Sequence, residues 1–521
     1  MDQFNEASGL DQNHEQSVDD PNVWIVTMPF FSHVVSASRL ARQISRQGIS
    51  VTLFGAKDDI RRLETIGDRD LTNWSQEASG ITVRSLEISS TKLADTVGGG
   101  QRILGPVAQA VQAFEQILTE ALDENSTSKP TYVIIDFLLP AALSIAFNLK
   151  VPACPFIPFS AGFVATNYYV KRLALGNRLA MPDSFAGMDS EVQQEVISLP
   201  GLPLMRMCDV NPISFKDSPV YELGWKLAGT LEKADVLLLS GFHELEPRAY
   251  EELTRMLNPR SGCKNGRTLT NVWPIGPLFD ISSDTEQRST TVTEGIDEEA
   301  ISCIKFLDSH PPSSVVYVAF GTDLNLRREQ IQELAYGLES SQRPFLCVLH
   351  PPKKSSLSEE EVQDAVSVIP EDCLARIGDK GMFAKWAPQM DVLSHPSTGA
   401  FMSHCGYNSV VETVCLGVPI LAWPFQYDQF MNCRHLVDGV EISMEVSPGL
   451  LPGGLVDRMC VEKSITTLFE SEEGLALRNR CLEMKQRAQM SVGAQGSSTR
   501  NMEALVALIK GLAKLNLSNS S

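Results

Sequence analysis

Short apolar runs alternate with helical patterns along nearly the whole chain. Runs without a polar face are typical of strands buried between two layers of helices. Their regular alternation with helices predicts a parallel α/β architecture instead of an all-helical or antiparallel fold. The expected strands are residues 23–28, 51–54, 132–136, 314–321, 344–349, 382–385, 399–402 and 419–422. The expected helices are residues 39–47, 107–122, 328–341, 473–489 and 499–515.

The alternation is interrupted once, by the polar sequence DISSDTEQRSTTVTEGIDEE. A polar stretch without periodicity is typical of a linker. Because 521 residues are too many for one core, we expect two Rossmann-like α/β domains that face each other across a cleft. The expected division is a flexible leader at 1–21, a first domain at 22–279, the linker at 280–299, a second domain at 300–490, and at 491–521 a tail with a C-terminal helix that packs back on the first domain.

The charge and the cysteines restrict the possible partners and location. The formal net charge is -20, from 44 basic and 64 acidic side chains, and nucleic-acid binding needs a basic surface. The N-terminus lacks the basic and apolar segments of a secretory signal, and no apolar run has the length of a transmembrane helix. The 11 cysteines include no CxxC pair, so reduced thiols are expected. We expect a monomeric cytoplasmic protein.

Ligands of such domains bind at the carboxyl ends of parallel strands, so the cleft is the expected active site. In the second half, SHCGYNS at 403–409 lies between an expected strand and a helix. Gly406 permits a tight turn, and Asn408 or Ser409 can cap the helix. Free N–H groups at such a helix N-terminus suit a diphosphate, to which His404 can add a side-chain donor. Glu412 lies on the same helical face as Asn408.

Each of these positions also has an ordinary structural interpretation. Trp386 could be a core residue, and Glu412 could be a surface charge of its helix. Asp428 and Gln429 could form the first turn of the following helix, where an acid is favoured. Taken singly, each structural interpretation is the better one.

Residues 386–429 read WAPQMDVLSHPSTGAFMSHCGYNSVVETVCLGVPILAWPFQYDQ. This segment closely resembles the 44-residue box of plant secondary-product glycosyltransferases, a family of UDP-sugar-dependent enzymes. FHELEP at 242–247, WPIGP at 273–277 and VVYVAFGT at 315–322 support the resemblance, which extends more weakly over 22–515. The joint occurrence of these residues at the family's spacing favours the binding interpretation. The resemblance implies the GT-B fold and a UDP-sugar co-substrate, with no other cofactor.

The resemblance implies a role for each polar position of the box. The diphosphate is expected at His404, Gly406, Asn408 and Ser409, with Thr322 as a further contact. Other expected donor contacts are Glu412 for the ribose hydroxyls, Trp386 for stacking on uracil, Ala387 and Gln389 for base and ribose hydrogen bonds, and Asp428 and Gln429 for the sugar hydroxyls.

Two positions of the box bear on the identity of the sugar. Gln429 occupies the last position, where the family associates Gln with glucose, so UDP-glucose is the expected donor. Tyr407 stands near the sugar, where the family usually has Trp. A tyrosine keeps an aromatic wall and adds a hydroxyl, so UDP-xylose, UDP-galactose or a broader donor range stays open.

A candidate catalytic pair lies in the first half. His33 follows the first expected strand, and Asp136 ends the strand YVIID. The family keeps its general base in a pattern like GHxxPxxxLA; here His33 is kept, with Ser32 for Gly and Ser36 for Pro. By resemblance His33 removes the acceptor's proton and Asp136 orients its imidazole in an inverting displacement. The structural alternatives are an ordinary histidine and a helix N-cap at Asp136.

The sequence leaves several alternative functions to be weighed. A non-catalytic UDP-sugar-binding protein on the same fold is the main alternative, against which His33 and Asp136 argue. A nicotinamide dehydrogenase would need GxGxxG after a strand, and a P-loop NTPase would need GxxxxGK[ST]; neither motif occurs. His395, His404 and Cys405 lack further ligands at metal spacing, so no metal is expected.

The acceptor is the least constrained part of the prediction. We expect a small lipophilic molecule such as a phenol, flavonoid, terpenoid or hormone, and the atom attacked stays open. The candidate walls are residues 97–104, 156–169 and 199–207. The aromatic residues in them, Phe156, Phe159, Phe163, Tyr168 and Tyr169, are equally consistent with a core.

Overall fold

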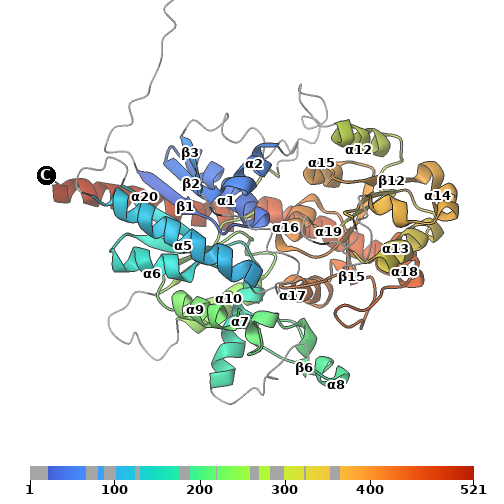
Figure 1. Cartoon of the computed structure of the whole chain (residues 1–521), viewed down its shortest axis with the longest axis horizontal. Helices are drawn as coiled ribbons and strands as arrows, with labels where there is room; N and C mark the ends of the chain where they lie inside the picture. The colour runs from blue at the N-terminus through green and yellow to red at the C-terminus, as the bar shows by residue number, and fades with distance from the viewer. Residues whose placement is uncertain are drawn as a thin grey trace, which may run out of the picture.

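The chain folds into two parallel β-sheets, one in each half, with helices packed around each sheet (Figure 1). The computed structural model describes residues 21–65, 80–86, 88, 101–123, 129–175, 188–218, 220–258, 269–281, 298–321, 324, 326–351 and 364–520. The first sheet has the order β3-β2-β1-β4-β5-β8-β9, and the second has the order β12-β11-β10-β13-β14-β15. All of the strand pairs within these two sheets are parallel. The expected α/β class with two Rossmann-like domains is confirmed.

The strands of the first sheet are β1 (Asn22–Val26), β2 (Ser50–Ala56), β3 (Ile81–Leu86), β4 (Tyr132–Asp136), β5 (Ala153–Ile157), β8 (Val236–Leu239) and β9 (Asn271–Pro274). Those of the second sheet are β10 (Val315–Ala319), β11 (Phe345–Val348), β12 (Gly381–Ala384), β13 (Thr398–Ser403), β14 (Ile420–Ala422) and β15 (Ser443–Glu445). A separate antiparallel hairpin consists of β6 (Val196–Ile197) and β7 (Met205–Arg206).

The helices of the first half are α1 (Phe31–Ser45), α2 (Lys57–Thr65), α5 (Gln101–Ala121), α6 (Pro140–Asn148), α7 (Ala161–Leu175), α8 (Ser190–Gln193), α9 (Tyr221–Leu231) and α10 (Pro247–Leu257). Those of the second half are α12 (Glu298–Asp308), α13 (Arg328–Ser340), α14 (Glu371–Ile377), α15 (Gln389–Ser394), α16 (Tyr407–Leu416), α17 (Gln429–Arg434), α18 (Arg458–Glu470), α19 (Glu472–Ser491) and α20 (Ser497–Ser520). None of the described helices combines the length and the apolar composition that crossing a bilayer requires.

The strand order explains where each half can bind a ligand. In the first sheet β1 lies between β2 and β4. The chain therefore continues from β1 toward one edge of the sheet, to β2, and from β4 toward the other edge, to β5. The second sheet repeats this arrangement with β10 between β11 and β13. Such a switch in strand order opens a crevice at the carboxyl ends of the two central strands. His33 follows β1 and Asp136 ends β4, while His404 follows β13, so these residues lie at the two switch points.

One expected helix has a different start. We expected a helix at 39–47, but α1 begins at Phe31, so His33 lies in its first turn and not in a loop. Eleven of the fifteen residues of α1 are buried, including polar ones. Because almost every face of α1 is covered, it lacks the single apolar stripe by which helices are found in sequences.

The C-terminal helix crosses back to the first half. Leu505, Val506 and Ile509 of α20 belong to the same buried cluster as Val23 and Ile25 of β1. The Asn501 side chain donates to the carbonyl of Pro274, at the end of β9, at 2.8 Å. Residues 1–20 and 282–297 lie outside the described residues, so the expected leader and most of the expected linker stay predictions, as do the domain boundaries.

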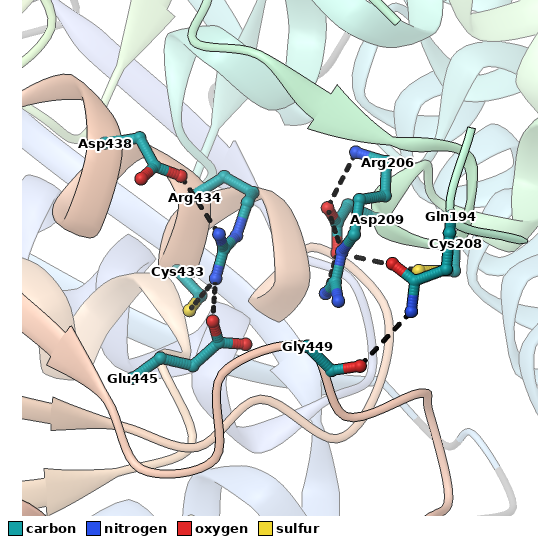
Figure 2. Close-up of polar contacts among 9 residues, drawn as sticks. All are labelled: Gln194, Arg206, Cys208, Asp209, Cys433, Arg434, Asp438, Glu445 and Gly449. Atoms are coloured by element: carbon teal, nitrogen blue, oxygen red, sulfur yellow. Dashed lines mark hydrogen bonds and ion pairs between the residues drawn. The ribbon is translucent and has the colours of Figure 1, made fainter. Parts of the chain in front are cut away.

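A second contact between the halves is polar. Arg206 pairs with the fully buried Asp209 at 2.7 Å on the first half, and Arg434 pairs with Glu445 on the second. Figure 2 shows these ion pairs on either side of the boundary, with Gln194 donating across it to the carbonyl of Gly449 at 3.2 Å. The hydrogen bond from Gln194 therefore joins the two halves here, in addition to the apolar packing of α20.

Candidate active site

His33 and Asp136 form a buried pair. The His33 Nδ1 lies 2.7 Å from the Asp136 Oδ2, and the side chains are 9% and 2% exposed. The carboxylate also accepts the backbone N–H of Met28 at 3.3 Å and that of Leu138 at 2.9 Å. Because a carboxylate only accepts hydrogen bonds, Nδ1 carries the proton and Nε2 presents a lone pair. The pair therefore has the geometry of a general base with an orienting acid.

The alternative role of Asp136 as a helix cap is wrong. Helix α6 begins four residues later, at Pro140, and Leu139 occupies its N-cap position without a side-chain cap. Asp136 is thus fixed by backbone N–H groups and by the imidazole, so its position serves His33 and not the helix.

Two aromatic rings lie next to the base. Phe159 contacts the His33 ring edge-on at 5.3 Å and stacks on Phe163 at 4.8 Å. Phe159 is half-buried, whereas Phe163 is buried. Of the expected acceptor walls, 156–169 therefore reaches the base. Phe156 and Tyr168 are core residues, while 97–100 lies outside the described residues.

The SHCGYNS segment forms the expected strand–turn–helix. Cys405 has a φ of 64°, in the left-handed region, and Gly406 occupies the N-cap position of α16. The expectation that Asn408 or Ser409 caps this helix is wrong, because both lie inside its first turn and no side chain caps it. The first N–H groups of α16 therefore have no acceptor within the helix, which suits an anionic ligand.

His404 lies against this turn with its imidazole enclosed. If Gly321 were replaced by a residue with a side chain, its Cβ would lie 2.8 Å from the His404 Nε2. A Cβ at position 406 would also collide with the ring. Both glycines are therefore needed for the imidazole to fit. Burial lowers the pKa of His404 to about 4, and its Nδ1 has no hydrogen-bond partner among the described residues. At neutral pH this side chain can offer a hydrogen bond but no positive charge.

The carboxylate of Glu412 is engaged on both oxygens. Arg39 of α1 pairs with Oε1 at 2.7 Å, and Gln389 donates to Oε2 at 2.6 Å. The side chains of Arg39 and Glu412 are 5% and 6% exposed, so the surface-charge interpretation of Glu412 is wrong. Gln389 also donates to the Ser409 hydroxyl at 3.1 Å. Sequence reasoning missed Arg39, because the sequence contains no local signal that pairs it with a carboxylate of the other half.

Asn408 connects the same two helices. Its side-chain amide donates to the carbonyl of Ser32 at 2.9 Å and accepts from the Ser36 hydroxyl at 2.8 Å. Ser36 stands where the family pattern has proline, whose side chain could not make this bond. The helix of the base and the helix of the donor motif are therefore in direct polar contact.

Asp428 and Gln429 lie at the start of α17. The Asp428 carboxylate accepts a hydrogen bond from the Asn432 side chain at 2.8 Å. The side-chain oxygen of Gln429 accepts the backbone N–H groups of Phe425 and Gln426 at 2.9 and 3.0 Å. The Gln429 amide group therefore has its N–H donors left for other partners. Burial raises the pKa of Asp428 to about 6, against the opposing effects of Asn432 and of His33 across the boundary.

The remaining expected donor residues have varied surroundings. Trp386 is only half-buried, which disagrees with a core role and leaves ring surface for stacking. Ala387 is buried beside it. The Tyr407 hydroxyl donates to Glu246 of the first half at 2.9 Å, a contact that was not expected, and its place near the sugar stays a prediction. Thr322 lies outside the described residues.

The described residues contain no group of three or more side chains suited to hold a metal ion. His395, considered as a ligand, lies 3.2 Å from Asp308 and accepts the N–H of Ser397. These contacts give it a structural role.

Comparison with known proteins identifies similar sequences and folds. A family described as UDP-glucoronosyl and UDP-glucosyl transferase matches residues 291–447. Phloretin 2'-O-glucosyltransferase of Pyrus communis is 32% identical over 402 residues, covering 75% of this chain and 79% of that protein.

Solved structures share the whole fold. The crystal structure of TcCGT1 in complex with UDP has a TM-score of 0.77 and 25% identity, covering 95% of this chain and 100% of that one. Medicago truncatula UGT71G1 complexed with UDP-glucose has a TM-score of 0.74 and 23% identity, covering 95% and 99%. The two facing α/β domains thus have the GT-B arrangement.

Proposed function

Because this chain belongs to the plant family of UDP-dependent glycosyltransferases, we propose that it transfers glucose from UDP-glucose to a small lipophilic acceptor, with inversion at the anomeric carbon. The observation that carries the proposal is the His33–Asp136 pair at the carboxyl ends of β1 and β4, facing the donor motif of the second half. His33 acts to lower the pKa of Asp428, against the larger effect of burial, which supports a sugar site near the base.

In the proposed reaction, the Nε2 of His33 takes the proton from the acceptor's nucleophilic atom. That atom forms a bond to the anomeric carbon while the bond from this carbon to the UDP oxygen breaks. Asp136 keeps the imidazole oriented and stabilises the imidazolium that results. A single displacement converts an α-linked donor into a β-linked product.

The geometry of the second half supports the following donor contacts. The N-terminus of α16 takes the departing diphosphate, assisted by a neutral hydrogen bond from His404. Glu412 takes the ribose hydroxyls, and Trp386 stacks on the uracil. Thr322, Ala387, Gln389 and Ser409 complete the nucleotide site as the family resemblance implies.

Glucose is supported by Gln429. Its side-chain oxygen accepts two backbone N–H groups, which fixes the orientation of the side-chain amide and leaves its N–H donors for other partners. Asp428 provides the complementary acceptor for sugar hydroxyls. The phloretin relative is named a glucosyltransferase, and UGT71G1 was solved with UDP-glucose.

The acceptor is proposed to be lipophilic because the base is flanked by Phe159 and Phe163. An aromatic ring gains both apolar contact and favourable ring geometry beside such residues. The phloretin relative's name is that of an enzyme for a phenolic acceptor. Phenols are therefore the first class to test.

We further propose a cytoplasmic monomer. The ten cysteines in the described part of the chain are all free, and most are buried. Free thiols are typical of a reducing compartment. Light scattering of the purified chain tests the monomer, and imaging of a fluorescent fusion tests the location.

The experiment is a screen for UDP release and product mass with UDP-glucose and a panel of phenols, terpenoid alcohols and phloretin. We expect turnover with at least one phenol, and His33→Ala should lower kcat by about a thousandfold or more, since general-base catalysis contributes that order. His310→Ala, between the end of α12 and the start of β10, is the matched control. UDP binding without turnover would identify a binding protein, and absence of UDP binding would refute the proposal.

A further inference from the structure

Tyr407 reaches from the donor motif into the first half of the molecule. Its backbone is the first residue of α16, where the diphosphate is proposed to bind. Its side chain is buried and extends the other way, and its hydroxyl donates to the Glu246 Oε2 at 2.9 Å. The two residues are 161 positions apart in the sequence. One residue thus joins the donor site to the acceptor half.

The fold provides space for this hydroxyl. Any residue with a side chain in place of Gly241 would put its Cβ in collision with the Tyr407 hydroxyl oxygen. The same Cβ would lie 2.9 Å from the Tyr250 hydroxyl oxygen. Burial, with the nearby Glu246 charge, raises the pKa of Tyr407 well above its usual value, so its phenol stays protonated. The hydroxyl is therefore a permanent donor in a pocket that fits it.

Glu246 is the acceptor of two further hydrogen bonds. It is only 1% exposed, and it accepts the N–H of Ala161 at 3.1 Å and that of Gly162 at 3.0 Å. These are the first two residues of α7, so the carboxylate binds the positive end of that helix. A buried carboxylate needs several donors to remain stable, and Tyr407 supplies the one that comes from the other half.

The N-terminus of α7 leads directly to the base. Phe163 is the third residue of α7, and Phe159 precedes the helix by two residues. Phe159 stacks on Phe163 and meets the His33 ring edge-on. A displacement of the α7 N-terminus would therefore move the aromatic wall relative to the imidazole.

We propose that Tyr407 and Glu246 are positioning residues that fix the aromatic wall of Phe159 and Phe163 against the base, in register with the donor helix α16. This inference rests on the proposed function. It assigns an effect on acceptor binding to Tyr407, a residue of the donor motif. It also gives a physical reason for tyrosine where the family usually has tryptophan, because Glu246 accepts a hydrogen bond from the hydroxyl.

The test is Tyr407→Phe, which keeps the ring and removes the hydroxyl. We expect the KM for the best phenol of the screen to rise about tenfold, since a hydrogen bond to a charged group is lost. The Kd of UDP, measured by calorimetry, should change less than about twofold, because the α16 backbone stays in place. Tyr336→Phe, which removes a phenol hydroxyl from α13, is the control and should leave both values unchanged.

A second variant keeps the proposal falsifiable if Tyr407→Phe folds poorly. Glu246→Gln keeps an acceptor for Tyr407 but weakens the cap of α7, so the acceptor KM should again rise while UDP affinity holds. The double variant should cost less than the product of the single effects, as expected for one shared network. Equal losses for donor and acceptor, or no change in the acceptor KM, would overturn the inference. Failure of the wild type to bind UDP would instead overturn the proposed function.

Discussion

Asp428 is a carboxyl group held away from water beside the base. Burial raises its pKa to about 6, above its ordinary value of 3.8. The folded state therefore binds a proton more tightly than the unfolded state, and ionisation of Asp428 costs stability above pH 6. That cost fades as the pH falls through 6 toward 4, where both states are protonated.

Replacement of this carboxyl by an amide tests the cost. Asp428→Asn should raise the free energy of unfolding at pH 8 by up to about 3 kcal/mol, because about two units of pKa shift are removed. The gain should shrink as the pH is lowered to 5. Urea unfolding at the two pH values measures it, and a gain that is independent of pH would contradict the assignment to ionisation.

The same variant should affect the sugar and not the nucleotide. An amide offers one acceptor oxygen in place of two, so the KM for UDP-glucose should rise while the Kd of UDP stays within about twofold. In the wild type, the KM for UDP-glucose should rise as the pH falls below 6. Asp438→Asn, an exposed acid after α17, is the control.

At the scale of elements, α1 and α16 form the junction of the two halves. His33, Ser36 and Arg39 follow one another at intervals of three on α1. His33 binds Asp136, while the other two contact Asn408 and Glu412 of α16. The helix with the base is thereby attached to the helix with the donor contacts, so a ligand between them must rearrange this junction.

Arg39 is predicted to compete with the donor's ribose for Glu412. Arg39→Met should tighten UDP binding by about fivefold to tenfold, because the Oε1 of Glu412, which Gln389 does not contact, then gains a partner only when the ribose arrives. The same variant should lower the free energy of unfolding by about 3 kcal/mol, since a buried charge loses its partner. Calorimetric titration with UDP measures the first effect, and urea unfolding measures the second.

Arg46→Met removes an equal charge from the exposed residue just after α1 and should leave both quantities unchanged. Weaker UDP binding by Arg39→Met would show that the guanidinium binds the nucleotide itself, contrary to the prediction.

Elements were predictable from the sequence where they carry a local signal. Strand β4 lies at the residues expected, 132–136, because five consecutive buried residues form a recognisable apolar run. The start of α1 was missed because its buried faces hide the helical period. The aromatic and acidic residues of the donor motif were predicted through their fixed spacing, and their roles stay predictions.

The connections between the halves were not predictable in the same way. Ser36 and Asn408 are 372 positions apart, and a single sequence contains no signal that pairs such residues. The Glu412 charge could be placed on a helix face but not assigned to Arg39, because its partner depends on how two domains pack. The bond from the Tyr407 hydroxyl to Glu246 was not predictable for the same reason.

At the scale of the whole molecule, the two halves share their cores. Helix α20 follows the second half in sequence but contributes Leu505, Val506 and Ile509 to the core of the first. In the other direction, Phe242 and Leu245 of the first half belong to the main cluster of the second. Because each half is completed by residues from the other, we expect the chain to unfold as one cooperative unit.

Ile509→Ala tests this shared core, since Ile509 is fully buried against strands that lie more than 200 residues earlier. The cavity should lower the free energy of unfolding by about 2–5 kcal/mol. If the halves are coupled, both unfold in one transition. Hydrogen exchange in β4 and in β13 should then show the same loss of stability. Leu515→Ala, at a side chain 60% exposed on the same helix, should change stability by less than about 0.5 kcal/mol. A transition that splits, with β13 unaffected, would mean that the halves are stable independently and that α20 stabilises only the first.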